Sequence, residues 1–193
     1  HNETYVITEL NCMKKLQTER LLLRPWRISD AESLYYYARD KRVGPIAGWP
    51  AHKSVAESTE IIQTIFMRDE VYAVTLLDDD KAIGLIGLSF CHESNFPIGD
   101  NDAEISYWIG TPFWGKGLIP EAVKALICHS FETLQLDNLW CGYFADNVNS
   151  KRVQEKCGFK YHHIIKDQYV EYLDEIRTEV ICRLTKSEWQ KQQ

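Results

Sequence analysis

Gly115, Lys116 and Gly117 form a short loop between a stretch with strand-like alternation and a stretch with helical periodicity. Glycine lets the backbone turn tightly and lets main-chain amides approach a ligand closely. Amides at the N-terminus of a helix bind anions, and the helix dipole strengthens that binding. Lys116 adds a positive charge, so the loop predicts a site for a phosphate or a pyrophosphate. The loop contains neither the GxxxxGK[ST] string nor the GxGxxG string of known nucleotide-binding loops.

The elements that must position this loop are predicted from periodicity, caps and turn residues. In chain order they are a strand at 21–23, a helix from Ser29 or Asp30 to about Arg39, a loop at 43–53, a helix capped by Ser54, a strand at 71–77, a turn at 78–81, a strand at 82–91, a loop at 95–101, a strand at 103–109, a helix at 120–134, a strand at 138–144, a short helix from Ser150 to Gly158, strands at 159–165 and 178–184, and a last capping box at Thr185 and Glu188. This order predicts a mixed α/β sheet with helices on both faces.

The composition is that of an ordinary globular protein. The chain has 193 residues, of which 45% are hydrophobic and 26% charged, so it fits a single domain. No apolar run reaches the length of a transmembrane helix, which argues against a membrane protein. The net charge of −6 argues against a nucleic-acid-binding protein and suits cationic partners such as amines.

Six cysteines are scattered along the chain without a CxxC pair or zinc-ligand spacing. We therefore expect no metal site, and we expect buried thiols in a reducing compartment, which is typical of a cytoplasmic protein. Met13 opens a stretch that resembles a natural start. Residues 1–12 are therefore predicted to be an extension, and residues 13–193 a single domain.

Four segments occur together in a specific order: LQTERLLLRPW at 16–26, AEISYWIG at 103–110, FWGKGLIPEA at 113–122 and NVNSKRVQEKCGF at 147–159. In these segments the chain resembles the GNAT acyltransferases, and within them the branch that acetylates the N-termini of ribosomal proteins. The resemblance covers about residues 16–185. It implies the GNAT fold, a mixed and mostly antiparallel sheet splayed between two strands, with helices on both faces. It also implies transfer of an acetyl group from acetyl-CoA to a primary amine.

The resemblance also implies which residues bind coenzyme A. The pyrophosphate loop of the family aligns with the segment from Trp114 to Ile119, where Ile119 replaces a small residue and could crowd the phosphate. The strand edge at Trp108, Ile109 and Gly110 would pair with the pantetheine arm, and Asn147 would hydrogen-bond to the same arm. The implied binding residues are Trp108, Ile109, Gly110, Trp114, Gly115, Lys116, Gly117, Leu118, Ile119, Asn147 and Ser150.

The catalytic groups follow from the same resemblance. Many relatives use a tyrosine as the general acid toward the leaving thiolate, and this chain has Gln154 at that position. The ribosomal branch is proposed to use a strand glutamate and the serine of an Asn-x-x-Ser motif instead. Glu104 and Ser150 match those two residues.

The chemistry itself favours an α-amine as acceptor, because the amine must be neutral to attack a thioester. Removing the proton at pH 7 costs roughly 4–5 kcal/mol for a lysine and about 1 kcal/mol for an α-amine. Glu104 could act as base through a water, and Ser150 could hydrogen-bond to the departing thiolate. Strand amides near Ile109 could hold the thioester carbonyl.

Each of these residues also fits an ordinary structural role. Glu104 fits a solvated strand residue, Ser150 a helix N-cap, Asn147 a turn, and Lys116 a solvated loop residue. A second function class therefore stays open, a CoA-binding regulatory module without turnover.

The preferred prediction is an N-acetyltransferase that works by direct attack in a ternary complex, with acetyl-CoA as co-substrate and no metal. The acceptor would be a protein N-terminus or a small amine, selected by the loops at 43–53 and 95–101. No nucleic acid or membrane partner is expected, and the protein would be a monomer or a homodimer.

Overall fold

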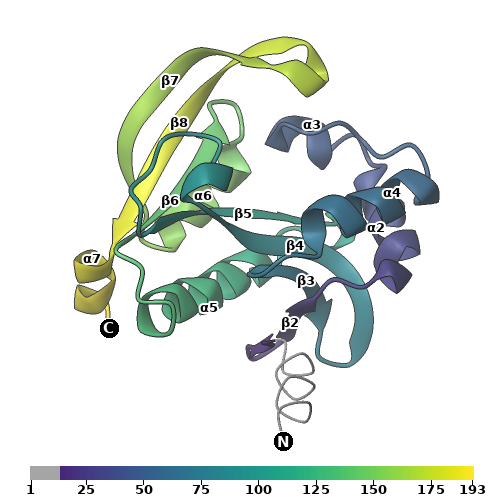
Figure 1. Ribbon diagram of the computed structural model, residues 1–193, viewed down its shortest axis with the longest axis horizontal. Coiled ribbons are helices and arrows are strands. Elements are labelled where there is room, and N and C mark those ends of the chain that lie inside the picture. The colour runs from purple at the N-terminus through teal and green to yellow at the C-terminus, as the bar shows by residue number, and fades with distance from the viewer. Residues whose placement is uncertain (1–13) are drawn as a thin grey trace, which may run out of the picture.

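Eight strands form one sheet in the order β1-β2-β3-β4-β5-β6-β8-β7, in a computed structural model that describes residues 14–193 (Figure 1). The strands are β1 Leu16–Gln17, β2 Leu21–Pro25, β3 Val71–Leu76, β4 Asp79–Phe90, β5 Asp102–Ile109, β6 Asn138–Phe144, β7 Lys160–Val170 and β8 Glu175–Thr185. The helices are α2 Ala31–Ala38, α3 Gly44–Ala47, α4 Val55–Ile61, α5 Leu118–Glu132, α6 Val148–Lys156 and α7 Lys186–Lys191. The predicted extension at 1–12, and Met13 itself, lie outside the described residues.

The neighbouring strands β5 and β6 pair in parallel, whereas the other neighbouring pairs are antiparallel. Their pairing is short, because it ends at Glu104 opposite Trp140 while β5 continues to Ile109 and β6 to Phe144. We call this unpaired region the splay. It leaves one edge of β5 and one edge of β6 without strand partners in the middle of the sheet. The predicted splayed, mixed sheet is therefore confirmed.

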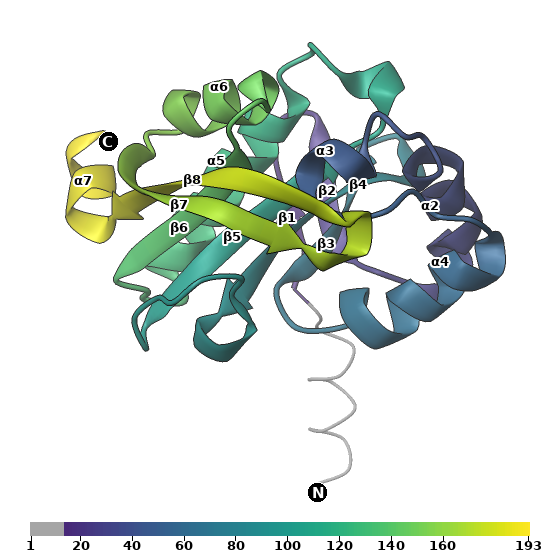
Figure 2. The same ribbon diagram turned by 90° about the horizontal axis from the view of Figure 1, so that it is seen from above.

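Helices cover both faces of the sheet, as predicted (Figure 2). The larger core lies between the sheet and α5, because that helix repeats apolar residues on one side: Val123, Leu126, Ile127 and Phe131 are all buried there. Helix α6 lies on the same face, where Cys157 at its end joins this core. A second core lies on the opposite face, where Leu34 of α2 packs with Ala73 and Trp108 of the sheet. Within residues 14–193, no helix has the length and apolar content to cross a bilayer.

Three local predictions are wrong. The loop predicted at 43–53 contains the short helix α3, which Gly48 ends in the left-handed conformation. The turn predicted at 78–81 is shorter, because β4 already begins at Asp79. Helix α6 begins at Val148 rather than at Ser150, and the cap is Asn147, whose Oδ1 accepts a hydrogen bond from the amide of Ser150. Asparagine is as good a cap as serine, so residue type alone did not decide between them.

A buried arginine links β2 to the segment that leads into α2. Arg24 on β2 is 1% exposed, and its guanidinium donates to both carboxylate oxygens of Asp30 at 2.8 and 2.9 Å. It also donates to the carboxylate of Asp80 at 2.8 Å. The sequence marks Arg24 only as the end of an apolar run, and the structure makes it a central ionic contact.

The hairpin of β7 and β8 forms one edge of the sheet, and its far end extends toward α3 (Figure 1). Arg177 on β8 donates to the carbonyl of Pro45 in α3 at 2.5 Å, and its guanidinium lies 5.0 Å from the ring of Phe144. The same guanidinium pairs with Glu175. These contacts join the hairpin to α3 and to the end of β6.

Candidate active site

The glycine loop has the backbone that an anion site requires. Gly115 and Gly117 both have φ of +74°, a left-handed conformation that suits glycine. Gly117 is the N-cap of α5, and no side chain caps the amides of that helix. The first amides of a helix lack partners within the helix, so they remain available to a ligand. A Cβ built on Gly115 meets no atom within 4 Å, so the space above the loop is open.

Arg20 holds this loop in place, a role that the sequence did not indicate. Its guanidinium donates to the carbonyl of Lys116 at 2.9 Å and pairs with Glu121 in the first turn of α5 at 2.8 Å. Glu121 also accepts from the amide of Arg20 and from the hydroxyl of Thr18. The carboxylate of Glu121 is therefore held by β1–β2 residues, and Arg20 adds positive charge beside Gly117.

The other predicted loop residues take distinct places. Trp114 is 41% exposed, and its indole donates to the carbonyl of Ile109 at 2.9 Å. The ammonium of Lys116 lies 5.8 Å from the centre of the Phe113 ring. Leu118 and Ile119 are buried in the core under α5. The expectation that Ile119 crowds the phosphate is therefore wrong, because its side chain points into the core.

Of the three residues predicted at the strand edge, Ile109 alone has main-chain groups that face the splay, and its carbonyl already accepts from the indole of Trp114. The amide of Gly110 donates to the carbonyl of Ile83 on β4 at 2.8 Å. Bonded pairs alternate along antiparallel strands, so Trp108 is likewise bonded to Leu85 of β4. By the same alternation, the main chains of Tyr107 and Ile109 face the splay. The main chains of Trp108 and Gly110 are therefore bonded to β4, which contradicts the expectation that they form the open edge, and the main chain of Tyr107 faces the splay instead.

A cluster of two hydroxyls and a side-chain amide lies where α6 meets β5 and β6. The hydroxyl of Tyr107 on β5 is 2.7 Å from the Oγ of Ser150 on α6. Gln154 donates to both hydroxyls at 3.3 and 3.4 Å and to the carbonyl of Gly142 on β6 at 3.0 Å. Gln154 therefore links β5 to β6 beside the splay, and its own Oε1 is buried without a donor. Burial raises the pKa of the Tyr107 phenol above its ordinary value.

Asn147 has a structural role in this cluster. Its Oδ1 caps α6, and its Nδ2 has no hydrogen-bond partner among the described residues. The Nδ2 group is therefore free to donate to a ligand. Ser150 lies in the first turn of the helix that Asn147 caps. The structure therefore brings Asn147 and Ser150 to the same side of the splay.

Glu104 lies on the opposite face, because alternate residues of β5 point to opposite sides. It is 4% exposed, so the expectation of a solvated strand residue is wrong. Its Oε1 accepts hydrogen bonds from the amide of Asn95 at 2.9 Å and from the hydroxyl of Ser94 at 3.1 Å. Burial raises the pKa of Glu104, and these hydrogen bonds oppose that shift. Glu104 thereby fixes the loop predicted at 95–101.

A second carboxylate that the sequence did not reveal lies on the same face as Glu104. Glu179 on β8 is 8% exposed, and its Oε1 occupies the place that a Cβ on Gly142 would fill. Burial and the charge of Glu104 raise the pKa of Glu179 to about 7. No sequence signal marks Glu179, since strand residues of this type are common and usually solvated.

The loop at 43–53 reaches the same face. The ring of Trp49 lies 5.5 Å from that of Trp108, and His52 is buried against Ser58 at 2.8 Å. Both predicted acceptor loops therefore border the face that carries Glu104 and Glu179. The arrangement places the glycine loop, with its uncapped helix amides, at one end of the splay, carboxylates on one face and hydroxyls on the other.

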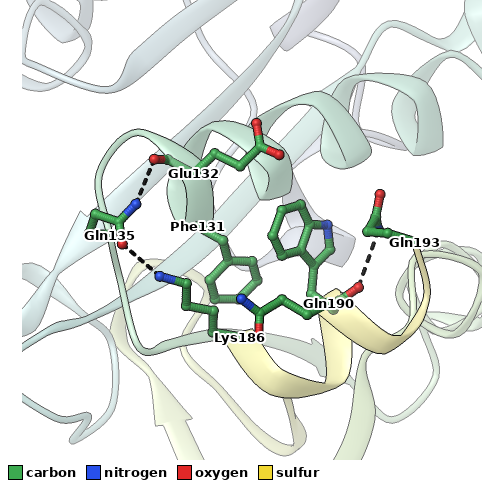
Figure 3. A pocket seen from close by; sticks show the side chains of 7 residues that line it. Phe131, Glu132, Gln135, Lys186, Gln190 and Gln193 are labelled. Atoms are coloured by element: carbon green, nitrogen blue, oxygen red, sulfur yellow. Dashed lines mark hydrogen bonds between the residues drawn. The ribbon is translucent and has the colours of Figure 1, made fainter.

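A separate hollow of about 420 Å³ lies between α5 and α7, far from these groups (Figure 3). Phe131 and Trp189 form its floor, and Lys186 reaches across its rim to the side chain of Gln135 at 2.6 Å. It is an open surface depression without a nucleophile or a buried charge. The groups at the splay therefore make it a better candidate site than this hollow, despite the volume of the hollow.

The chain is similar in sequence to known proteins. The sequence model of the acetyltransferase (GNAT) domain matches residues 20–160. An uncharacterized N-acetyltransferase, p20, of Bacillus licheniformis is 28% identical over 160 residues, which are 80% of this chain and 87% of p20. The ribosomal protein uS5-alanine N-acetyltransferase of Escherichia coli is 25% identical over 190 residues, which are 91% of this chain and 92% of that enzyme.

The fold has solved counterparts as well. The microcin C7 self-immunity acetyltransferase MccE, solved in complex with acetyl-CoA and AMP, superimposes with a TM-score of 0.72 at 18% identity. The match covers 87% of this chain and 93% of that one. At this identity the likeness concerns the fold alone.

Proposed function

The chain belongs to the GNAT family of acetyltransferases, and from this premise we propose that it transfers the acetyl group of acetyl-CoA to a primary amine. The observation that carries the proposal is the glycine loop at α5, which leads directly to the unpaired edge of β5. No other part of residues 14–193 combines uncapped helix amides, an open strand edge and buried ionisable groups.

The residues present fit coenzyme A. The uncapped amides of Leu118 and Ile119, with those of Gly115 to Gly117, suit a diphosphate, and the open space above Gly115 admits it. The edge at Tyr107 and Ile109 suits the amides of a pantetheine arm, and the Nδ2 of Asn147, which has no partner among the described residues, can donate to the same arm. Arg20 and Lys116 supply positive charge locally in a chain of net charge −6. Bound there, acetyl-CoA would supply the activated acetyl group.

The two faces of the splay carry groups for different parts of the reaction. An amine that enters beside Glu104 meets negative charge, which attracts its ammonium form. A carboxylate on this face can then accept the ammonium proton, directly or through a water. On the other face, Ser150 can donate a hydrogen bond to a developing thiolate, and Tyr107 and Gln154 orient its hydroxyl. Attack is direct, and the chain supplies no covalent intermediate.

We propose that the acceptor is the N-terminal α-amine of a protein. The likeness to the uS5-alanine N-acetyltransferase over 91% of this chain supports this choice. The lower cost of deprotonating an α-amine supports it too, since the site offers carboxylates rather than a strong base. Such an acceptor would be met in the cytoplasm, where the five described free thiols would also remain reduced.

The decisive experiment measures thiol release from acetyl-CoA with a panel of Ala- and Ser-initiated peptides, lysine-containing peptides with blocked N-termini, and small amines. We expect release with free α-amines and a mass increase of one acetyl group on the peptide. Tight CoA binding without acceptor-dependent release would favour a regulatory module instead. Absence of CoA binding would contradict the whole assignment.

Tyr107→Phe should lower kcat about tenfold and leave CoA affinity unchanged, because the lost hydroxyl orients Ser150 and lies away from the glycine loop. Steady-state kinetics and calorimetry with CoA measure the two effects. Tyr143→Phe is the matched control, since Tyr143 packs against the same core without a hydrogen bond from its hydroxyl among the described residues. Equal kcat values for the two variants would remove Tyr107 from the mechanism.

A further inference from the structure

Two carboxylates face the acceptor side of the splay, and their surroundings differ. Glu104 is held by the loop at residues 94 and 95, with four oxygen contacts between 2.9 and 3.3 Å from Ser94 and Asn95. Among the described residues, the side chain of Gln168 is the one hydrogen-bond partner of Glu179. Glu104 therefore already accepts several hydrogen bonds, whereas Glu179 has more capacity left to accept a proton from a ligand.

The position of Glu179 is built by the sheet. It stands on β8 opposite Phe144 of β6 and Ile165 of β7, so neighbouring strands enclose it on both sides. Gly142 on β6 makes room for it, since any Cβ there would overlap the Glu179 Oε1. Gly142 lies two residues beyond Trp140, the last residue of β6 that pairs with β5. The carboxylate of Glu179 therefore lies over the edge of the splay.

The charged groups around Glu179 leave it without a counter-ion. Glu104 on β5 repels it, and this repulsion adds to burial in raising the pKa of Glu179 to about 7. Arg177, two residues along β8, is bound to Glu175 and to the carbonyl of Pro45. On β7, His163 lies two residues from Ile165, and Gln168 alone favours the charged form. A buried carboxylate without a counter-ion attracts a cationic ligand.

We propose that Glu179 is the group that accepts the proton of the acceptor ammonium, and that Glu104 positions the acceptor loop and sets the charge around Glu179. This proposal rests on the proposed acetyl transfer. The ammonium nitrogen gives one proton to the Glu179 carboxylate, and the neutral amine then attacks the thioester carbonyl. The N–C bond forms, the C–S bond breaks, and a second proton from nitrogen ends on the sulfur.

A base is most useful when its pKa lies near the working pH, and Glu179 meets this condition better than an exposed glutamate would. The rate increase that this base provides must vanish when the acceptor amine is already neutral in solution. An α-amine of pKa about 7.7–8.0 is mostly protonated at pH 7 and mostly neutral at pH 9.5. This difference gives a test that a purely structural role would not satisfy.

The probe is an Ala-initiated peptide without lysine. Glu179→Gln should lower kcat/KM at least about tenfold at pH 7 and less than about threefold at pH 9.5. Glu155→Gln on the exposed side of α6 is the charge-matched control and should behave as the wild type at both pH values. Glu104→Gln should raise KM for the peptide more than it lowers kcat, because it releases the loop at residues 94 and 95. A pH-independent defect in Glu179→Gln, or none, would overturn the assignment.

A second readout does not depend on turnover. Carbon-13 NMR titration of labelled glutamate carboxyls should show one group near pH 7 that disappears in Glu179→Gln and remains in Glu155→Gln. Titration of Glu179 below pH 5 would overturn the proposal even if the enzyme is active. A group at pH 7 in a protein that acetylates no amine would instead contradict the proposed function, and so the two failures are distinguishable.

Discussion

Gly117→Asp should weaken coenzyme A binding by at least about 100-fold, the equivalent of about 2.7 kcal/mol. Gly117 is the N-cap of α5 with φ of +74°, and its neighbours supply the amides that face the diphosphate. An aspartate there adds negative charge to an anion site and draws Arg20 toward itself, since the guanidinium lies 3.6 Å from the position of the new Cβ. Titration calorimetry with CoA measures the loss.

Gly117→Ala separates charge from backbone strain. Alanine in the left-handed conformation costs roughly 1–2 kcal/mol, so it should weaken CoA binding by at most about tenfold. The thermal midpoints of the two variants should be similar, because both carry the same strained backbone. Unchanged affinity in Gly117→Asp would mean that the glycine loop does not bind the diphosphate.

Arg24→Met should lower the free energy of unfolding by about 3–5 kcal/mol. Methionine keeps much of the volume of Arg24 but leaves the carboxylate of Asp30, which is 6% exposed, without its cation. The amide of Arg27 still donates to Asp30, and this bond offsets a small part of the loss. Urea unfolding followed by circular dichroism measures the difference. The ionic contact lies on β2, away from the splay, so the folded fraction should keep its affinity for CoA.

Arg27→Met is the matched control for that variant. Arg27 pairs with the same Asp80, but its side chain is 49% exposed and that of Asp80 is 64% exposed. Ion pairs of this kind contribute about 0–1 kcal/mol, so the control should be close to wild type. Equal destabilisation by the two variants would show that burial does not govern the strength of these contacts.

The order of the elements could be read from the sequence because its signals are local. Alternation over 103–109 and helical spacing from 120 onward reflect which side of each element meets the core, and the structure places both elements there. The glycine loop was recognisable for the same reason, since Gly115 and Gly117 adopt the positive φ that their residue type suggested. The cap of α6 was misplaced by three residues because serine and asparagine cap helices equally well.

The partners in the candidate site were decided by tertiary structure alone. Tyr107 and Ser150 are 43 residues apart, and Arg20 and Glu121 are 101 apart, so no local pattern joins them. Glu104 was found from its motif, but its burial came only from the loop that folds over it. Glu179 was invisible in the sequence, because its basicity depends on a glycine in β6 and a charge in β5. Sequence periodicity determines which face a side chain takes, whereas its electrostatics depend on residues that the fold brings close from distant parts of the chain.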